Sequence, residues 1–132
     1  MNNIIRLKRI KKEIVNFCDN DLQILHDEDD INIIVIIQSK FKFVLNKKYP
    51  FSAPQLFIND INYLQFFKIK NKNLNNILNE NSILCPCCNS ILCFWCPTYI
   101  MSDVIDEYYK NIKLLKYLYK YYLLQKISKK LL

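Results

Sequence analysis

The chain contains no glycine among its 132 residues. Glycine adopts positive φ angles most easily, so tight turns in this chain have to use asparagine or aspartate, the next most tolerant residues. The length is typical of one domain, and the hydrophobic share of 52% is enough for a core that needs neither disulfides nor metal. We therefore expect a single domain over residues 1–132.

Hydrophobic spacing predicts helices at the two ends and strands between them. Residues 4–17 place apolar side chains at three- and four-residue steps, which is typical of an amphipathic helix. An extended segment begins at residues 22–25, and the β-branched and aromatic residues of 31–38 and 41–45 then predict two or three antiparallel strands. Another short strand is predicted over 55–58. Asparagine accumulates over 59–81, which predicts a long surface loop with at most a short helix. An apolar stripe from Val104 to Tyr122 predicts one long C-terminal helix or two consecutive ones. This order indicates an α+β fold.

The net charge of +7 comes mainly from lysines and arginines near the two ends of the chain. These residues recur among apolar ones at helical spacing, so we interpret them as solvated helix faces rather than a nucleic-acid surface. The apolar runs are shorter than the roughly 18 residues that suggest a membrane span, and the first residues lack the apolar stretch of a signal peptide. We expect a cytoplasmic or nuclear protein that binds neither membrane nor nucleic acid.

Five of the six cysteines crowd into one segment: Cys85, Cys87, Cys88, Cys93 and Cys96. In a reducing compartment such a cluster indicates metal binding or catalysis rather than a disulfide framework. Cys18 stands apart, and we expect it to be buried and inert.

Three segments resemble ubiquitin-conjugating enzymes, in the order that this family has. Residues 7–14 (LKRIKKEI) resemble the opening helix of the family, and residues 49–54 (YPFSAP) resemble its Tyr-Pro-x-x-x-Pro turn, which non-catalytic RWD domains share. Residues 95–97 (WCP) are similar to the Trp-Ser-Pro that follows the catalytic cysteine. The chain lacks the His-Pro-Asn that the family carries after the proline turn. The resemblance implies a divergent UBC-like fold: an N-terminal helix, an antiparallel meander sheet and C-terminal helices.

The resemblance implies a transferase that accepts ubiquitin, or a ubiquitin-like protein, as a cysteine thioester and passes it to a lysine, directly or through a ubiquitin ligase. Two cysteines compete for the role of nucleophile. Cys85 follows an Ile-Leu approach similar to that of the family, and Cys87 lies at the commonest family distance from Trp95. Gln65 or a backbone amide is the candidate to replace the amide of the missing asparagine. Transfer itself needs no cofactor.

The same resemblance implies a docking face for the ubiquitin-activating enzyme on the first helix, formed by Arg6, Lys8, Arg9 and Lys12. The absence of His-Pro-Asn leaves a second interpretation open, in which the chain is a non-catalytic variant or an RWD-like interaction module.

The cysteine spacing itself predicts a structural zinc site. Two C-x-x-C pairs, formed by Cys85, Cys88, Cys93 and Cys96, could bind one tetrahedral ion through four thiolates. Cys87 lies outside both pairs, so it could react while the other four hold zinc. A third alternative is that the cysteines are small apolar residues packed beneath the last helix.

Overall fold

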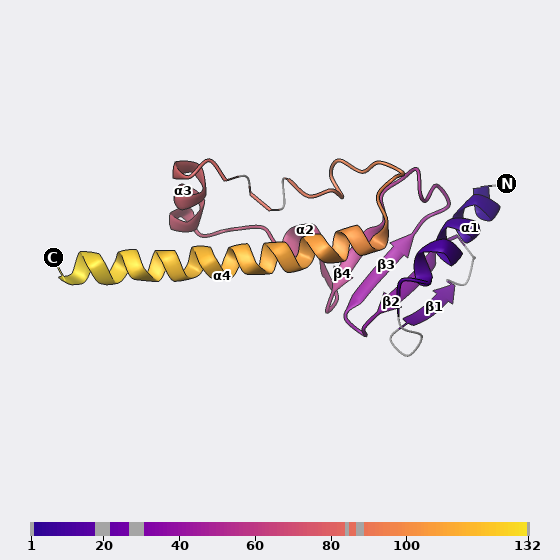
Figure 1. Cartoon of the computed structure of the whole chain (residues 1–132), viewed down its shortest axis with the longest axis horizontal. Helices are drawn as coiled ribbons and strands as arrows, with labels where there is room; N and C mark the ends of the chain where they lie inside the picture. Colours follow the sequence, from indigo (N-terminus) through magenta and orange to yellow (C-terminus); the bar gives the residue numbers. More distant parts are fainter. Residues whose placement is uncertain (1, 18–21, 27–30, 84, 87–88, 132) are drawn as a thin grey trace.

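The computed structural model describes residues 2–17, 22–26, 31–83, 85–86 and 89–131. Within these ranges five strands form one antiparallel sheet in the order β1-β2-β3-β4-β5, so each strand pairs with its neighbours in sequence. A helix precedes the sheet and a long helix ends the described chain (Figure 1). The architecture is therefore α+β, as the sequence predicts.

The elements and their bounds follow the predicted pattern closely for the strands. Their order is α1 (Asn2–Ile14), β1 (Leu22–His26), β2 (Ile33–Ile37), β3 (Phe41–Leu45), β4 (Gln55–Ile58), β5 (Ile61–Asn62), α2 (Tyr63–Phe66), α3 (Lys72–Glu80) and α4 (Met101–Leu131). Of the two alternatives for the C-terminus, one continuous helix of 31 residues is found. Within the described ranges no helix combines the length and apolar character needed to cross a membrane.

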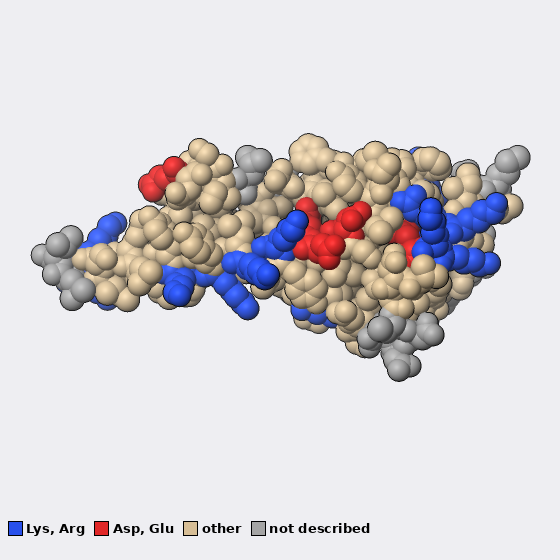
Figure 2. Space-filling model, in the orientation of Figure 1, with Lys and Arg blue, Asp and Glu red and all other residues tan. Residues whose placement is uncertain are grey.

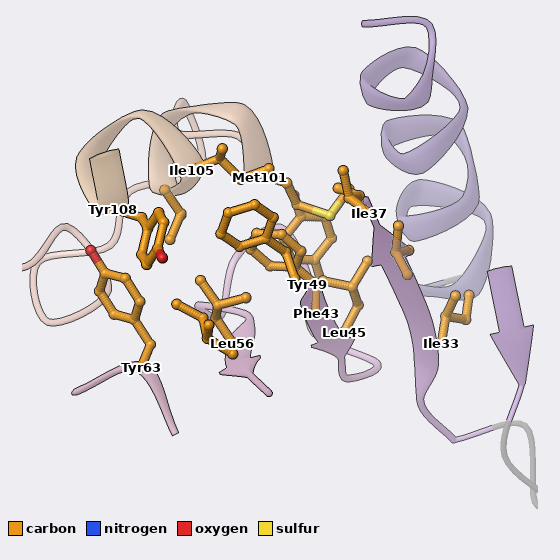
Figure 3. Close-up of a cluster of buried hydrophobic side chains, with 14 of the residues drawn as sticks. Ile33, Ile37, Phe43, Leu45, Tyr49, Leu56, Tyr63, Met101, Ile105 and Tyr108 are labelled. Carbon is orange, nitrogen blue, oxygen red and sulfur yellow. The ribbon is translucent and has the colours of Figure 1, made fainter. Parts of the chain in front are cut away.

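One face of the sheet is buried. Alternate residues of β2 and β3 are fully covered, and the register aligns Val35 with Phe43 and Phe43 with Leu56 in one row across three strands. The first turns of α4 cover this row with Met101, Val104, Ile105 and Tyr108, and Ile10 of α1 joins the same core. Figure 3 shows the α4 side chains directed at the sheet residues. This packing fixes the start of α4 over the sheet.

The buried face of α1 is in part the one that its apolar spacing predicts, since Ile10 is in the core and Ile14 packs against it. Ile4 and Leu7 are exposed, whereas Arg6, Ile10 and Glu13 are buried. The guanidinium of Arg6 donates through Nη1 to the carbonyl oxygens of Ile31, at 2.7 Å, and of Leu45, at 3.2 Å. These bonds to backbone carbonyls compensate the cost of burying the charge. Helix α1 is thus attached to the sheet by polar as well as apolar side chains.

Residues 59–81, predicted to form a long loop, are mostly regular. Asn62 and Asn71 are the N-cap residues of α2 and α3, and their side chains accept the backbone N–H of Leu64 and of Asn73. Helix α3 then packs on the far half of α4 through Ile77, Leu78 and Leu118. The asparagines therefore begin helices instead of marking an irregular loop.

Candidate functional site

The cysteine segment, residues 85–96, connects α3 to α4 and runs along the first half of α4 (Figure 1). Cys85 is half-buried, and Cys93 and Cys96 are exposed. Cys87, the second candidate nucleophile, and Cys88, a predicted zinc ligand, lie outside the described residues. Two sets of polar contacts hold the described parts of this segment.

The C-terminal end of the segment packs against the Tyr-Pro turn. The indole Nε1 of Trp95 donates to the carbonyl oxygen of Pro50 at 2.7 Å. The Trp95 ring lies 6.1 Å, between centroids, from the ring of Tyr49 and 5.8 Å from that of Tyr99. Two of the motifs that carry the resemblance, 45 residues apart, are therefore direct neighbours in space.

Helix α1 joins them through a buried carboxylate. Glu13 is 3% exposed and accepts hydrogen bonds from the Tyr49 hydroxyl and, at 2.7 Å, from the backbone N–H of Met101. Arg9 Nε lies 3.4 Å from the Glu13 carboxylate. We call Arg9, Glu13, Tyr49 and Met101 the Glu13 hub. The hub ties α1, the Tyr-Pro turn and the first residue of α4 to one another.

Burial dominates the electrostatics of the hub. It raises the pKa of the Glu13 carboxyl, although the hydrogen bonds from Tyr49 and Met101 and the positive charge of Arg9 act in the opposite direction. Burial, together with the neighbouring Glu13, also raises the pKa of the Tyr49 phenol far above its ordinary range. The Tyr49 hydroxyl therefore remains protonated and acts as a hydrogen-bond donor.

The four basic residues proposed for the docking face have different environments. Arg9 donates through Nη2 to the carbonyl oxygens of Pro97 and, at 2.8 Å, of Tyr99, so it holds the turn that follows the cysteine segment. Arg6 is 1% exposed and bonded to the sheet. Lys8 and Lys12 are exposed. Only these two of the four present their full charge at the helix surface.

Glu107 of α4 holds the middle of the cysteine segment. One carboxylate oxygen accepts the backbone N–H of Ile91 at 2.8 Å, and the other accepts the hydroxyls of Ser90, at 2.8 Å, and Tyr63, at 2.7 Å. Asn111, one turn later, donates to the Tyr63 hydroxyl at 3.2 Å. We call this set the Glu107 clamp. Burial, and then the hydrogen bond to Glu107, raise the pKa of Tyr63, so its hydroxyl too stays protonated.

Beside the clamp lies an open cleft of about 750 Å³ between the cysteine segment and α4. Pro86 and Asn89 lie on one side. The polar residues of α4 on the other side carry three carboxylates against one ammonium: Asp103, Asp106, Glu107, Lys110 and Asn111. Figure 2 shows acidic side chains gathered over the first turns of α4, between the lysines of its far half and the basic residues of α1. The cleft therefore has a negatively charged wall, and it borders the stretch that carries Cys85.

Gln65 does not line this cleft, and its side chain is exposed. The amide side chains that do line it are Asn89 and Asn111, neither of which the sequence reasoning selected. A signal for the clamp is present in the sequence. Glu107 and Asn111 are four residues apart and lie next to the predicted apolar stripe of the last helix, so they share one helix face near the core.

Among the described cysteines, Cys96 has a perturbed thiol. The hydroxyl of Thr98 donates to Cys96 Sγ at 3.4 Å, and this hydrogen bond lowers the pKa of the thiol. Cys96 is exposed, so this thiol is accessible to solvent. The residues that the structure describes contain no group of three or more His, Cys, Asp or Glu side chains arranged to hold a metal ion. The four-cysteine zinc site includes Cys88 and stays a prediction.

Comparison with known proteins adds no relative. No protein-family model, curated protein or solved structure matches the chain. The function therefore has to be inferred from the residues and their geometry.

Proposed function

We propose that this protein is a divergent ubiquitin-conjugating enzyme that carries ubiquitin, or a ubiquitin-like protein, as a thioester in its cysteine segment. One observation carries the proposal: the three segments that resemble the family meet at the Glu13 hub and at the contact between Trp95 and Pro50. Chance resemblances of short segments would not have to converge. Their convergence supports the proposal that all three segments belong to one UBC-like fold.

The proposed reaction has two steps. In the first, a thiolate of Cys85 or Cys87 attacks the carbonyl carbon of the thioester on the activating enzyme, and the cysteine thiolate of that enzyme leaves. In the second, the amine of an acceptor lysine attacks the new thioester, loses a proton and forms an isopeptide bond, and the cysteine thiolate of this chain leaves. Thiols exchange in the first step at little cost in free energy, so the protein has to position and polarise the reacting groups.

The cleft beside the Glu107 clamp supports the second step. A lysine amine is protonated in solution, and the carboxylates of Asp106 and Glu107 would attract it to the wall opposite Pro86. The Asn89 and Asn111 amides, which also line the cleft, are better placed than Gln65 to stabilise the oxyanion that forms in each step. In this proposal they replace the asparagine of the missing His-Pro-Asn.

The test is a charging assay with ubiquitin-activating enzyme, ATP and ubiquitin, in which the expected product is an adduct that a thiol reductant removes. Replacing the nucleophile, by Cys85→Ser or Cys87→Ser, should convert the adduct into an oxyester that resists reduction, or abolish it. Cys18→Ser, outside the segment, is the control and should charge normally. If the wild-type chain forms no adduct while its tryptophan fluorescence shows a folded protein, the enzyme proposal is wrong.

A second candidate function is a non-catalytic, RWD-like interaction module whose cysteine segment is closed by a zinc ion. The use of Arg6 and Arg9 in internal contacts favours it, because these side chains are then not available to dock an activating enzyme. Elemental analysis of the purified protein tests this candidate. One zinc ion per chain, lost in Cys93→Ser and in Cys96→Ser, would support it, and a metal-free folded protein that forms the thioester would exclude it.

A further inference from the structure

Helix α4 extends well beyond the sheet. At a rise of 1.5 Å per residue its 31 residues span about 46 Å. Its first turns cover the sheet, whereas its second half projects away from the domain and contacts α3 on one side (Figure 1). A projecting helix of this length needs partners for its apolar residues, because packing supplies most of the stability of helices in water.

The face of α4 that covers the sheet continues as an apolar stripe where the sheet has ended. Leu115, Tyr119 and Leu123 follow one another at four-residue steps on the same side of the helix as the buried Tyr108. Tyr119 is 55% exposed and Leu123 42%. The stripe therefore changes from core to open surface along one helix face.

A groove follows this stripe. It has a volume of about 490 Å³ and is lined by Leu74 of α3 and by Leu115, Lys116, Tyr119, Lys120 and Leu123 of α4. Its surface is almost entirely apolar, because the two lysines contribute the methylene groups of their side chains. We call it the α3–α4 groove. It is a shallow, open groove, with Leu74 of α3 on one side and the α4 residues forming the rest of its surface.

The charge around the groove has one sign. After Glu107 the sequence contains seven lysines and no acidic residue. In the described part of the chain neither Lys116 nor Lys120 takes part in an ion pair, and Figure 2 shows lysines along the projecting helix. A ligand that placed carboxylates beside these lysines would gain both hydrogen bonds and Coulomb attraction.

These observations disfavour two other occupants. A second copy of this chain, paired in parallel along α4, would set the seven lysines that follow Glu107 beside the same seven lysines of its partner. The phosphates of a nucleic acid would bind the lysines but would leave the apolar groove unfilled.

We propose that the α3–α4 groove binds an amphipathic helix of another protein, with apolar residues at i, i+4 and i+7 flanked by acidic residues. This mode of recognition places the apolar face of a helix in a hydrophobic groove. The proposal is independent of the proposed transfer reaction, since no residue of the groove belongs to the cysteine segment or to the Glu107 clamp.

The probes are two fluorescent synthetic helices of about five turns with the same leucine face, one flanked by glutamate and the other by lysine. Fluorescence anisotropy with the full chain should show that the glutamate helix binds at least tenfold more tightly than the lysine helix. Leu123→Glu should weaken binding of the glutamate helix at least tenfold. Tyr119→Ser should weaken it several-fold, whereas Tyr117→Ser, on another face of α4, should leave it unchanged.

A charge exchange makes the test sharper. The double variant Lys116→Glu with Lys120→Glu should reverse the preference, so that the lysine helix binds more tightly. Lys47→Glu with Lys48→Glu, which makes the same change in net charge in an exposed turn, should not. Equal binding of both helices, or no effect of the groove variants, would overturn the proposal. So would a groove-dependent preference for anionic vesicles or single-stranded RNA, or a dimer in light scattering that Leu123→Glu dissociates.

Discussion

Removing the Glu13 carboxylate should destabilise the protein more than any exposed substitution on the same helix. In Glu13→Ala the Tyr49 hydroxyl and the Met101 N–H lose their acceptor, and Arg9 loses its counter-charge. Each buried donor left without a partner costs about 1–3 kcal/mol, and breaking a buried ion pair costs about 3–5 kcal/mol in all. These contributions overlap, so we expect Glu13→Ala to lower the free energy of unfolding by about 3–5 kcal/mol. The whole free energy of unfolding of a small domain is about 5–15 kcal/mol, so this loss is a large part of it.

The assay is urea unfolding followed by fluorescence and by far-ultraviolet circular dichroism. The chain has a single tryptophan, Trp95, which packs on the hub residue Tyr49, so its fluorescence reports the region under test. With a slope of about 1.5 kcal/mol/M, a loss of 3 kcal/mol moves the midpoint down by about 2 M. Tyr49→Phe removes one of the two donors and should cost about 1.5–3 kcal/mol, which keeps the test informative if the alanine variant does not fold.

Lys12→Ala is the matched control, because Lys12 precedes Glu13 and is exposed. It should change the free energy of unfolding by less than about 0.5 kcal/mol. If Glu13→Ala and Lys12→Ala shift the midpoint equally, the hub does not hold the three elements together and the reasoning is refuted.

Three further predictions concern acidity, a turn and a thiol. Burial raises the pKa of the Glu13 carboxyl in the folded state. The stability that Glu13 confers relative to Glu13→Gln should therefore be largest below the pKa of the unfolded state and should decline as the pH rises through the pKa of the folded state. Urea midpoints of both proteins from pH 4 to 8 measure this difference. Ser39, at φ 53° in the β2–β3 turn, occupies a conformation that suits glycine, so Ser39→Gly should raise the free energy of unfolding by about 0.5–1 kcal/mol, and a loss would contradict the turn geometry. Thr98→Val removes the donor to Cys96, so alkylation of Cys96 at neutral pH, followed by mass spectrometry, should slow several-fold, and an unchanged rate would exclude this cause.

The strands could be predicted from sequence because their signal is local. Residues 41–45 and 55–58 were expected as strands, and β3 and β4 have those bounds. The expectation that asparagine or aspartate occupies the turn positions of positive φ is confirmed only in part. Asn59 and Asp60 adopt positive φ, as expected for a chain without glycine, but so do Gln38 and Ser39 in the three-residue connection between β2 and β3, because a tight turn imposes that geometry on whichever residues occupy it.

The helices between the sheet and the cysteines could not be predicted with the same rules. Helix α3 buries Ile77 and Leu78 against Leu118 of α4, about forty residues later in the chain. No pattern within a short window contains that partner. The asparagine-rich composition therefore predicts a loop, although Asn62 and Asn71 occupy the N-cap positions that favour this residue.

The sequence predicts which segments form the candidate site, but not which side chains hold it together. The Tyr-Pro turn and Trp95 do lie together, and the cysteine segment does border a cleft. In the first helix, the spacing of apolar residues is not sufficient to predict which polar side chains are buried. Arg6 lies four residues before the buried Ile10, on the same face, but a charged residue is expected at the surface unless its backbone acceptors are known. Glu107 is missed for the same reason, since its partners come from two distant parts of the chain.

The sequential order of the sheet has a consequence for synthesis on the ribosome. Every strand pairing joins neighbours in the chain, so the sheet can form as soon as β5 has emerged. Glu13, in contrast, waits for Met101, 88 residues later, which at about 5–20 residues per second is a delay of roughly 4–18 s. From the end of β5 at Asn62 to Met101, 39 residues later and therefore roughly 2–8 s at the same rate, the sheet exposes the face that α4 will cover, including Phe43 and Leu56. The nascent chain thus passes through a stage in which a chaperone could bind this open apolar face, and docking of α4 would end it.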